Sequence, residues 1–90
     1  MAEVFLEARG LPDKFDPGLM SRHAVREAER ERIPIDMIAQ AYEDPDDTRL
    51  SDDDEMREIR TRWFGEEGVE IVVDADDGRI VTTWRKGLKP

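Results

Sequence analysis

The single histidine of this sequence stands close to two arginines at helical spacing. Arg26 and Arg30 follow His23 at i+3 and i+7, which places the three side chains on one side of a helix. Imidazole is the one side chain here that titrates unaided near neutral pH, and a guanidinium group is well shaped to bind phosphate. Metal-independent cleavage of RNA needs such groups: a base or acid at the 2′-hydroxyl and the leaving oxygen, and cations beside the phosphorane.

Three residues of predicted strands add to this candidate site. Arg60 and Arg62 share one face of a strand and are candidates for a second phosphate-binding wall. The hydroxyl of Thr82 is a candidate for orienting a phosphate oxygen. The candidate catalytic residues are therefore His23 and Thr82, and the candidate substrate-binding residues are Arg26, Arg30, Arg60 and Arg62.

Each of these residues also has a purely structural interpretation, which stays open at this point. A histidine at a helix start is often a capping or packing residue, and arginines near glutamates on a helix form surface ion pairs. Strand arginines that alternate with apolar residues are typical of a solvated face, and threonine is a common strand residue. Trp63 and Trp84 could stack on bases, but in so small a domain we expect them in the core.

The acidic residues do not form a metal-binding motif. The run from Asp52 to Glu55 lacks the spaced acids and the central glycine of a calcium loop. We interpret Asp74, Asp76 and Asp77 as part of a solvated hairpin turn. The chain has no cysteine and one histidine, which excludes thiolate catalysis, disulfides and metal motifs built from cysteines or from two histidines. We therefore expect no metal and no other cofactor.

Composition limits the chain to one small acidic domain. Its 90 residues are 38% hydrophobic and 41% charged, with a formal net charge of −9. No apolar run approaches the roughly 20 residues of a membrane span, and the start lacks the features of a secretory signal. We expect a cytoplasmic protein without a membrane partner. Residues 45–56 hold six acids against one base, and such a balance repels nucleic acid.

Turn and capping residues divide the chain into an N-terminal segment, two helices and three strands. We interpret residues 1–20 as an edge strand or an arm, and residues 21–90 as a single domain. Ser21 is a suitable N-cap for a helix that ends before Pro34, and a second helix carries the stripe Ile35, Ile38, Ala39 and Tyr42. Residues 46–55 read as an acidic loop anchored by Leu50.

Alternating residues predict strands over 57–64, 69–74 and 79–85, joined by hairpin loops at 65–68 and 75–78. The fold class is therefore α+β, with two N-terminal helices packed on one face of a three- to four-stranded antiparallel meander sheet.

The order of these elements resembles a family of small bacterial domains of unknown function that is related to the RelE/ParE-like ribonuclease toxins. The resemblance covers residues 21–86. It is carried by Ser21-Arg22-His23-Ala24, the Arg-rich helix ending in Arg32-Ile33, Asp44-Pro45, Arg62…Gly65 and Gly78-Arg79-Ile80-Val81-Thr82. A more distant likeness to BrnT-type toxins lies in the helix-borne histidine and the downstream Asp-Pro. The resemblance implies a RelE-like fold of bacterial or phage origin, a site between helix and sheet, RNA (free or ribosome-bound) as substrate, and a cognate antitoxin as partner.

Two functions follow from this reading. The first is a metal-independent endoribonuclease of toxin type, assisted by His23 and arginine phosphate clamps. The alternative is a catalytically inactive acidic module, similar to an antitoxin or a nucleic-acid mimic, that docks on a basic protein partner through Asp52, Asp53 and Asp54. Dimerisation through a sheet edge stays open in either case.

Overall fold

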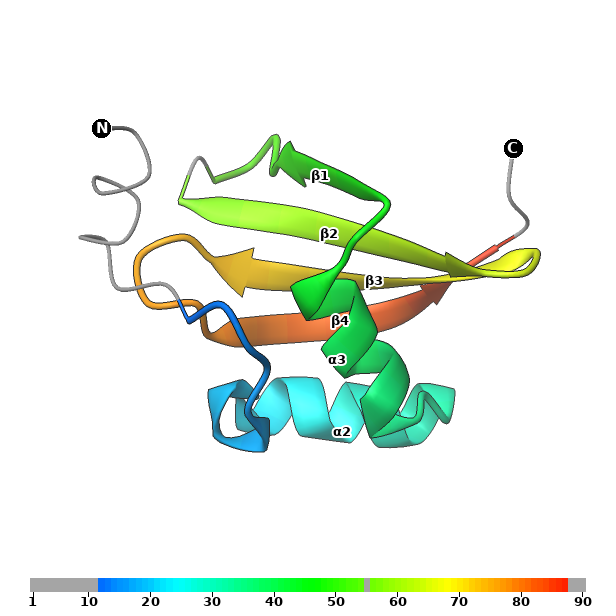
Figure 1. The fold of residues 1–90 in the computed structure, drawn as a ribbon. Coiled ribbons are helices and arrows are strands. Elements are labelled where there is room, and N and C mark those ends of the chain that lie inside the picture. The colour runs from blue at the N-terminus through cyan, green and yellow to red at the C-terminus, as the bar shows by residue number, and fades with distance from the viewer. Residues whose placement is uncertain (1–11, 55, 88–90) are drawn as a thin grey trace.

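The computed structural model describes residues 12–54 and 56–87 and shows an α+β fold (Figure 1). Its elements are η1 (Pro17–Leu19), α2 (Arg22–Glu31), α3 (Ile35–Glu43), β1 (Asp47–Leu50), β2 (Arg57–Phe64), β3 (Glu67–Asp74) and β4 (Ile80–Lys86). The strands form one antiparallel sheet in the order β1-β2-β3-β4, a meander. The predicted fold class is confirmed.

The fourth strand, β1, lies within residues 46–55, where we predicted a loop without secondary structure. The register pairs Thr48 with Arg60 and Leu50 with Glu58, so β1 is held by backbone hydrogen bonds to β2. All four of its residues are exposed, which explains why their side chains carry no apolar alternation. The strand suggested near the N-terminus falls outside the described residues.

Both helices begin where their capping residues indicate. The Ser21 Oγ accepts the N–H of Ala24 at 3.0 Å and donates to the carbonyl of Val81 at 2.9 Å, so the N-cap also ties α2 to β4. Pro34 is the N-cap of α3, a position that suits proline because it needs no backbone donor.

The core lies between the two helices and one face of the sheet. Its fully buried residues come from α2, α3, β3 and β4: Ala24, Ile38, Ala41, Tyr42, Val69, Ile71, Val73 and Ile80. Met20, which precedes α2, is buried and forms a parallel bridge with Ile80. This part of the N-terminal segment therefore packs against the same core. The predicted stripe of α3 is right at Ile38 and Tyr42, which are buried, and wrong at Ile35, which is 51% exposed. Val25 of α2 is 41% exposed.

The face of the sheet opposite the helices carries both tryptophans, a placement that corrects our prediction that they belong to the core. Trp63 is opposite Gly68 in the register, and a Cβ on Gly68 would lie 3.0 Å from its ring. Trp84 is opposite Glu70 and donates its indole N–H to that carboxylate. Strand alternation places both rings there, because their neighbours Phe64 on β2 and Thr83 on β4 lie on the helix-covered face.

Candidate functional site

The three predicted site residues of α2 lie on its outer surface. His23, Arg26 and Arg30 are all exposed, while Ala24 and Ala28 on the opposite side are buried against the sheet, as their spacing predicts. Arg30 forms an ion pair with Glu27 at 3.7 Å. This is the surface pairing that we considered as the structural alternative for the helix arginines.

Arg60 binds the C-terminal end of α3. Its Nη1 donates to the carbonyl of Tyr42 at 2.7 Å, its guanidinium carbon lies 4.7 Å from the centroid of the Tyr42 ring, and its Nε donates to Glu58 at 3.0 Å. A cation at a helix C-terminus is favourably placed against the helix dipole. Burial raises the pKa of Tyr42, although the charge of Arg60 acts in the opposite direction. Arg60 thus lies on the helix-covered face, where its donors bind Tyr42 and Glu58.

Arg62 binds the same helix end two residues further along the chain. Its Nη1 donates to the carbonyl of Asp44 at 2.7 Å and to the Asp44 carboxylate at 2.8 Å. Its Nε is buried and has no hydrogen-bond partner among the residues that the structure describes. Arg60 and Arg62 are therefore together, as their strand spacing predicts, but their donors are directed at the backbone of α3 and not at an open cleft.

Arg85 plays the equivalent part at the end of α2, a role that our sequence analysis missed. Its Nε and Nη2 donate to the carbonyls of Glu31 and Arg32 at 2.7 and 2.6 Å, and its Nη1 lies 3.1 Å from the Glu67 carboxylate. A signal was present in the sequence, since α2 ends without a glycine and its last carbonyls need other donors.

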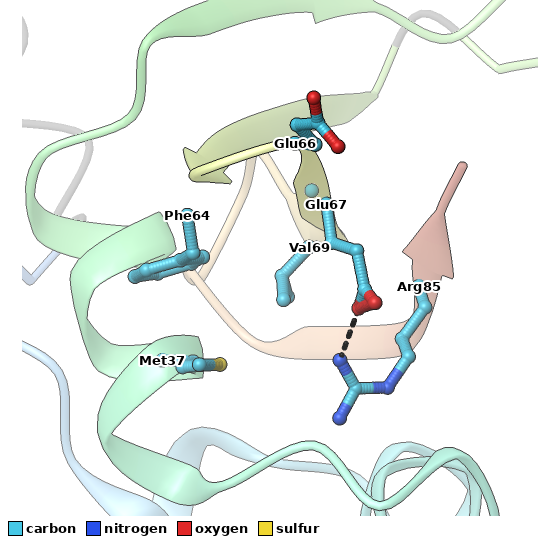
Figure 2. Close-up of a pocket in the computed structure, with 7 residues that line it drawn as sticks. Met37, Phe64, Glu66, Glu67, Val69 and Arg85 are labelled. Atoms are coloured by element: carbon cyan, nitrogen blue, oxygen red, sulfur yellow. Dashed lines mark hydrogen bonds and ion pairs between the residues drawn. The ribbon is translucent and has the colours of Figure 1, made fainter. Parts of the chain in front are cut away.

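A hollow of about 260 Å³ lies beside Arg85 (Figure 2). Phe64 and Met37 form an apolar side, and the ion pair between Glu67 and Arg85 forms the polar side. None of the six predicted site residues lines it. Because the guanidinium group of Arg85 already has three acceptors, one for each of its nitrogens, this hollow offers an incoming anion little unused binding capacity.

Thr82 lies on the opposite face of the sheet from Arg60 and Arg62. The register places it beside Val72 and two residues before Trp84, and β-strand alternation directs these side chains away from the helices. The six candidate catalytic and phosphate-binding residues are thus distributed over the outer surface of α2, the end of α3 and the open face of the sheet.

The centre of that open face is a buried carboxylate. Glu70 is 3% exposed, and its Oε2 accepts hydrogen bonds from Thr61 at 2.6 Å, Arg49 at 3.2 Å and Lys86 at 3.3 Å. Its Oε1 accepts the indole N–H of Trp84 at 3.0 Å. Burial by itself raises the pKa of Glu70, but the hydrogen bonds from Thr61, Lys86 and Arg49 outweigh burial, so the pKa is lowered. The donors hold this carboxylate ionised and join β1 to β4 across the sheet.

The acidic turn between β1 and β2 is compact and open to solvent. The Ser51 N–H donates to the carbonyl of Arg57 at 2.9 Å, and the Met56 N–H donates to Asp54 Oδ1 at 2.9 Å. Asp54 also lies 3.6 Å from Arg57, whereas Asp52 and Asp53 are exposed. Leu50, which we predicted to anchor this segment, is 59% exposed, because β1 extends along the sheet edge beyond the helices.

The described residues contain no group of three or more histidine or acidic side chains arranged to hold a metal ion. Across residues 12–54 and 56–87, no helix is both long enough and apolar enough to span a membrane.

The fold and the site define a small α+β protein whose strand arginines cap both of its helices and whose acidic turn extends from a sheet edge. No protein-family model, curated protein or solved structure matches the chain. The resemblance to RelE-like toxins therefore stays a prediction that rests on the motifs quoted above.

Proposed function

We propose that this protein is a non-catalytic binding module that docks on a basic protein partner through its acidic edge. The acidic edge is defined as residues 47–54, which include Leu50, together with Met56. One observation carries the proposal: at this edge, exposed carboxylates and two exposed apolar side chains occur together.

Each part of the acidic edge has a role in docking. Asp52 and Asp53 are exposed, so their charge acts over long range and speeds the encounter with a basic surface. Leu50 and Met56, 59% and 54% exposed, supply the apolar contacts that give a protein interface its stability. Asp54 shapes the turn through its hydrogen bond to the Met56 N–H.

The ribonuclease reading has less support. Of the four arginines considered as phosphate ligands, Arg30 is paired with Glu27, while Arg60 and Arg62 donate to the carbonyls of Tyr42 and Asp44. A phosphate would have to displace these partners. The net charge of −9 adds long-range repulsion of RNA.

The proposal is tested by comparing two triple variants as bait for partner capture. Asp52→Asn/Asp53→Asn/Asp54→Asn removes charge from the acidic edge and keeps the acceptor that binds the Met56 N–H. Asp13→Asn/Asp36→Asn/Glu66→Gln removes the same charge from exposed positions elsewhere. We expect the wild type and the control to capture basic proteins that mass spectrometry identifies, and the first variant to lose them.

The captured partner is then purified and its binding measured between about 50 and 300 mM salt, over which charge-driven binding weakens. Binding that responds neither to salt nor to the first triple variant contradicts the proposal. Metal-independent cleavage of RNA by the purified wild type, lost in His23→Ala, would support the ribonuclease reading in its place.

A further inference from the structure

The large apolar side chains that the structure leaves exposed fall into two pairs. Leu50 and Met56 belong to the acidic edge, and Val25 and Ile35, 41% and 51% exposed, belong to α2 and α3. The two pairs lie at opposite edges of the fold, because β1 is one edge of the sheet while α2 packs against β4, the other edge (Figure 1). The acidic edge of one chain therefore cannot contact Val25 or Ile35 of the same chain.

Val25 and Ile35 line an apolar groove between the two helices, which we call the helix groove. Its volume is about 370 Å³. Its lining is mostly aliphatic and includes Val25, Ala28, Ile33, Ile35, Ile38 and the side of Arg32. A groove of this size and composition can receive a small number of apolar side chains from a partner.

Two arginines beside the helix groove form no ion pair. Arg22 begins α2 and Arg32 is its C-cap; both are exposed, and neither forms an ion pair with another residue of the described ranges. Arg32 lines the groove, and Arg22 lies three residues before Val25, on a neighbouring side of the helix. Glu29 is the one acid in the lining. In a chain of net charge −9, this surface carries unpaired positive charge.

We propose that the helix groove is the docking site for the acidic edge of a second copy of this chain. Leu50 and Met56 of one copy enter the groove beside Val25 and Ile35, and Asp52 and Asp53 meet the unpaired arginines. The proposal rests on the proposed function, because it uses the same acidic edge, with the arginines beside the groove of an otherwise acidic second copy in the place of a basic partner's surface.

This contact joins two different surfaces, so its symmetry is head-to-tail. Each dimer keeps one free groove and one free edge, and further copies add until a ring closes or the chain of copies ends. Groove-to-groove pairing, which would be two-fold symmetric, stops at a dimer and does not use the acidic edge. The two arrangements therefore predict different behaviour of the same variants.

Single-surface variants test whether both surfaces are needed. Val25→Glu blocks the groove at an exposed helix position, where glutamate is a good helix former. Leu50→Lys/Met56→Lys blocks the edge with a residue that suits edge strands. Gln40→Glu and Gln40→Lys/Glu66→Gln make the same charge changes at exposed positions outside both surfaces. By sedimentation velocity, we expect wild type and controls to associate with rising concentration, and each blocked variant to show at least about tenfold weaker association.

Mixing the two blocked variants gives the decisive result. The Val25→Glu chain still has its edge and the Leu50→Lys/Met56→Lys chain still has its groove, so an equimolar mixture should form a 1:1 dimer that grows no further. With one variant fluorescently labelled, this dimer is distinguished from either chain alone. Self-association of Leu50→Lys/Met56→Lys alone, or the absence of a mixed dimer, overturns the proposal.

The failure of this inference is distinguishable from failure of the proposed function. A wild type that stays monomeric up to about 1 mM overturns self-docking. If the same protein captures a basic partner that Asp52→Asn/Asp53→Asn/Asp54→Asn loses, the acidic edge is still a docking surface. If that capture is also absent, both proposals are wrong.

Discussion

Replacing Glu70 with glutamine should destabilise the protein far more than the same change at Glu67 on the same strand. Glu70 is buried on the open face of the sheet and accepts four side-chain hydrogen bonds. Glutamine has nearly the same shape but no charge, and one of its two terminal groups is a donor. At least one of the four donors then faces another donor at the centre of the network.

The expected magnitude follows from the exposure of the partners. Hydrogen bonds to a charged group contribute about 1.5–3 kcal/mol each when buried. The side chains of Arg49 and Lys86 are 46% and 37% exposed, so water compensates much of their loss. The cost therefore falls mainly on the bonds from Thr61 and Trp84, and we expect Glu70→Gln to lower the free energy of unfolding by about 2 kcal/mol. For a domain of this size, this corresponds to a fall in Tm of roughly 10 °C.

Urea unfolding followed by tryptophan fluorescence measures this loss, since Trp84 contacts the substituted group directly. Glu67→Gln is the matched control: its carboxylate is 63% exposed and pairs with Arg85 at the surface, so the expected loss is below about 0.5 kcal/mol. Equal effects of the two substitutions would refute the reasoning.

The difference between wild type and Glu70→Gln should also depend on pH in one direction. The pKa of Glu70 is lower in the folded protein than the unfolded value of about 4.3, so ionisation favours the folded state above that value. This contribution is complete near neutral pH and is lost as pH falls through the folded pKa. The difference in free energy of unfolding should therefore be constant above about pH 5.5 and shrink below about pH 4. A constant difference throughout contradicts an ionised Glu70.

Three further substitutions test other parts of the fold. Gly68→Ala places a Cβ 3.0 Å from the ring of Trp63, so we expect a loss of about 1–2 kcal/mol in urea unfolding and a changed emission spectrum, and an unchanged spectrum counts against the stacking. Ser21→Ala removes the N-cap and the bond to Val81, with an expected loss of about 1–2 kcal/mol that Ser21→Thr largely restores; a neutral Ser21→Ala contradicts the cap. His23→Ala, at an exposed site, should change the free energy of unfolding by less than about 0.5 kcal/mol and leave RNA uncleaved, as in the wild type.

Local signals in the sequence were sufficient for most of the fold. Ser21 predicts the start of α2, and the run from Ile35 to Tyr42 predicts α3. Gly65, with a φ of 71°, marks the turn between β2 and β3. Such features act within a few residues, so the sequence displays them directly.

The edge strand β1 could not be predicted in the same way. Its four residues are all exposed, so no side-chain pattern distinguishes them from a loop. What holds them is the backbone pairing with β2, which depends on the position of a strand that comes later in the chain. The tryptophans show a related limit, because strand alternation assigns residues to two faces without indicating which face the helices cover.

The strand arginines explain why the candidate site of the sequence did not assemble and where the remaining charge lies. Neither helix has a glycine as its C-cap: the C-cap of α2 is Arg32, with a φ of 56°, and the C-cap of α3 is Asp44. Their last carbonyls are bound by Arg60, Arg62 and Arg85, each donating from the sheet. An arginine on an alternating strand thus has two possible roles: it is free to bind an anion, or it caps a helix that has no C-terminal glycine. These three cations are used inside the fold. Of the cations that form no ion pair among the described residues, three, Arg22, Arg26 and Arg32, belong to α2 or its C-cap, while exposed carboxylates lie at the acidic edge. That separation of charge is the physical basis of both docking proposals.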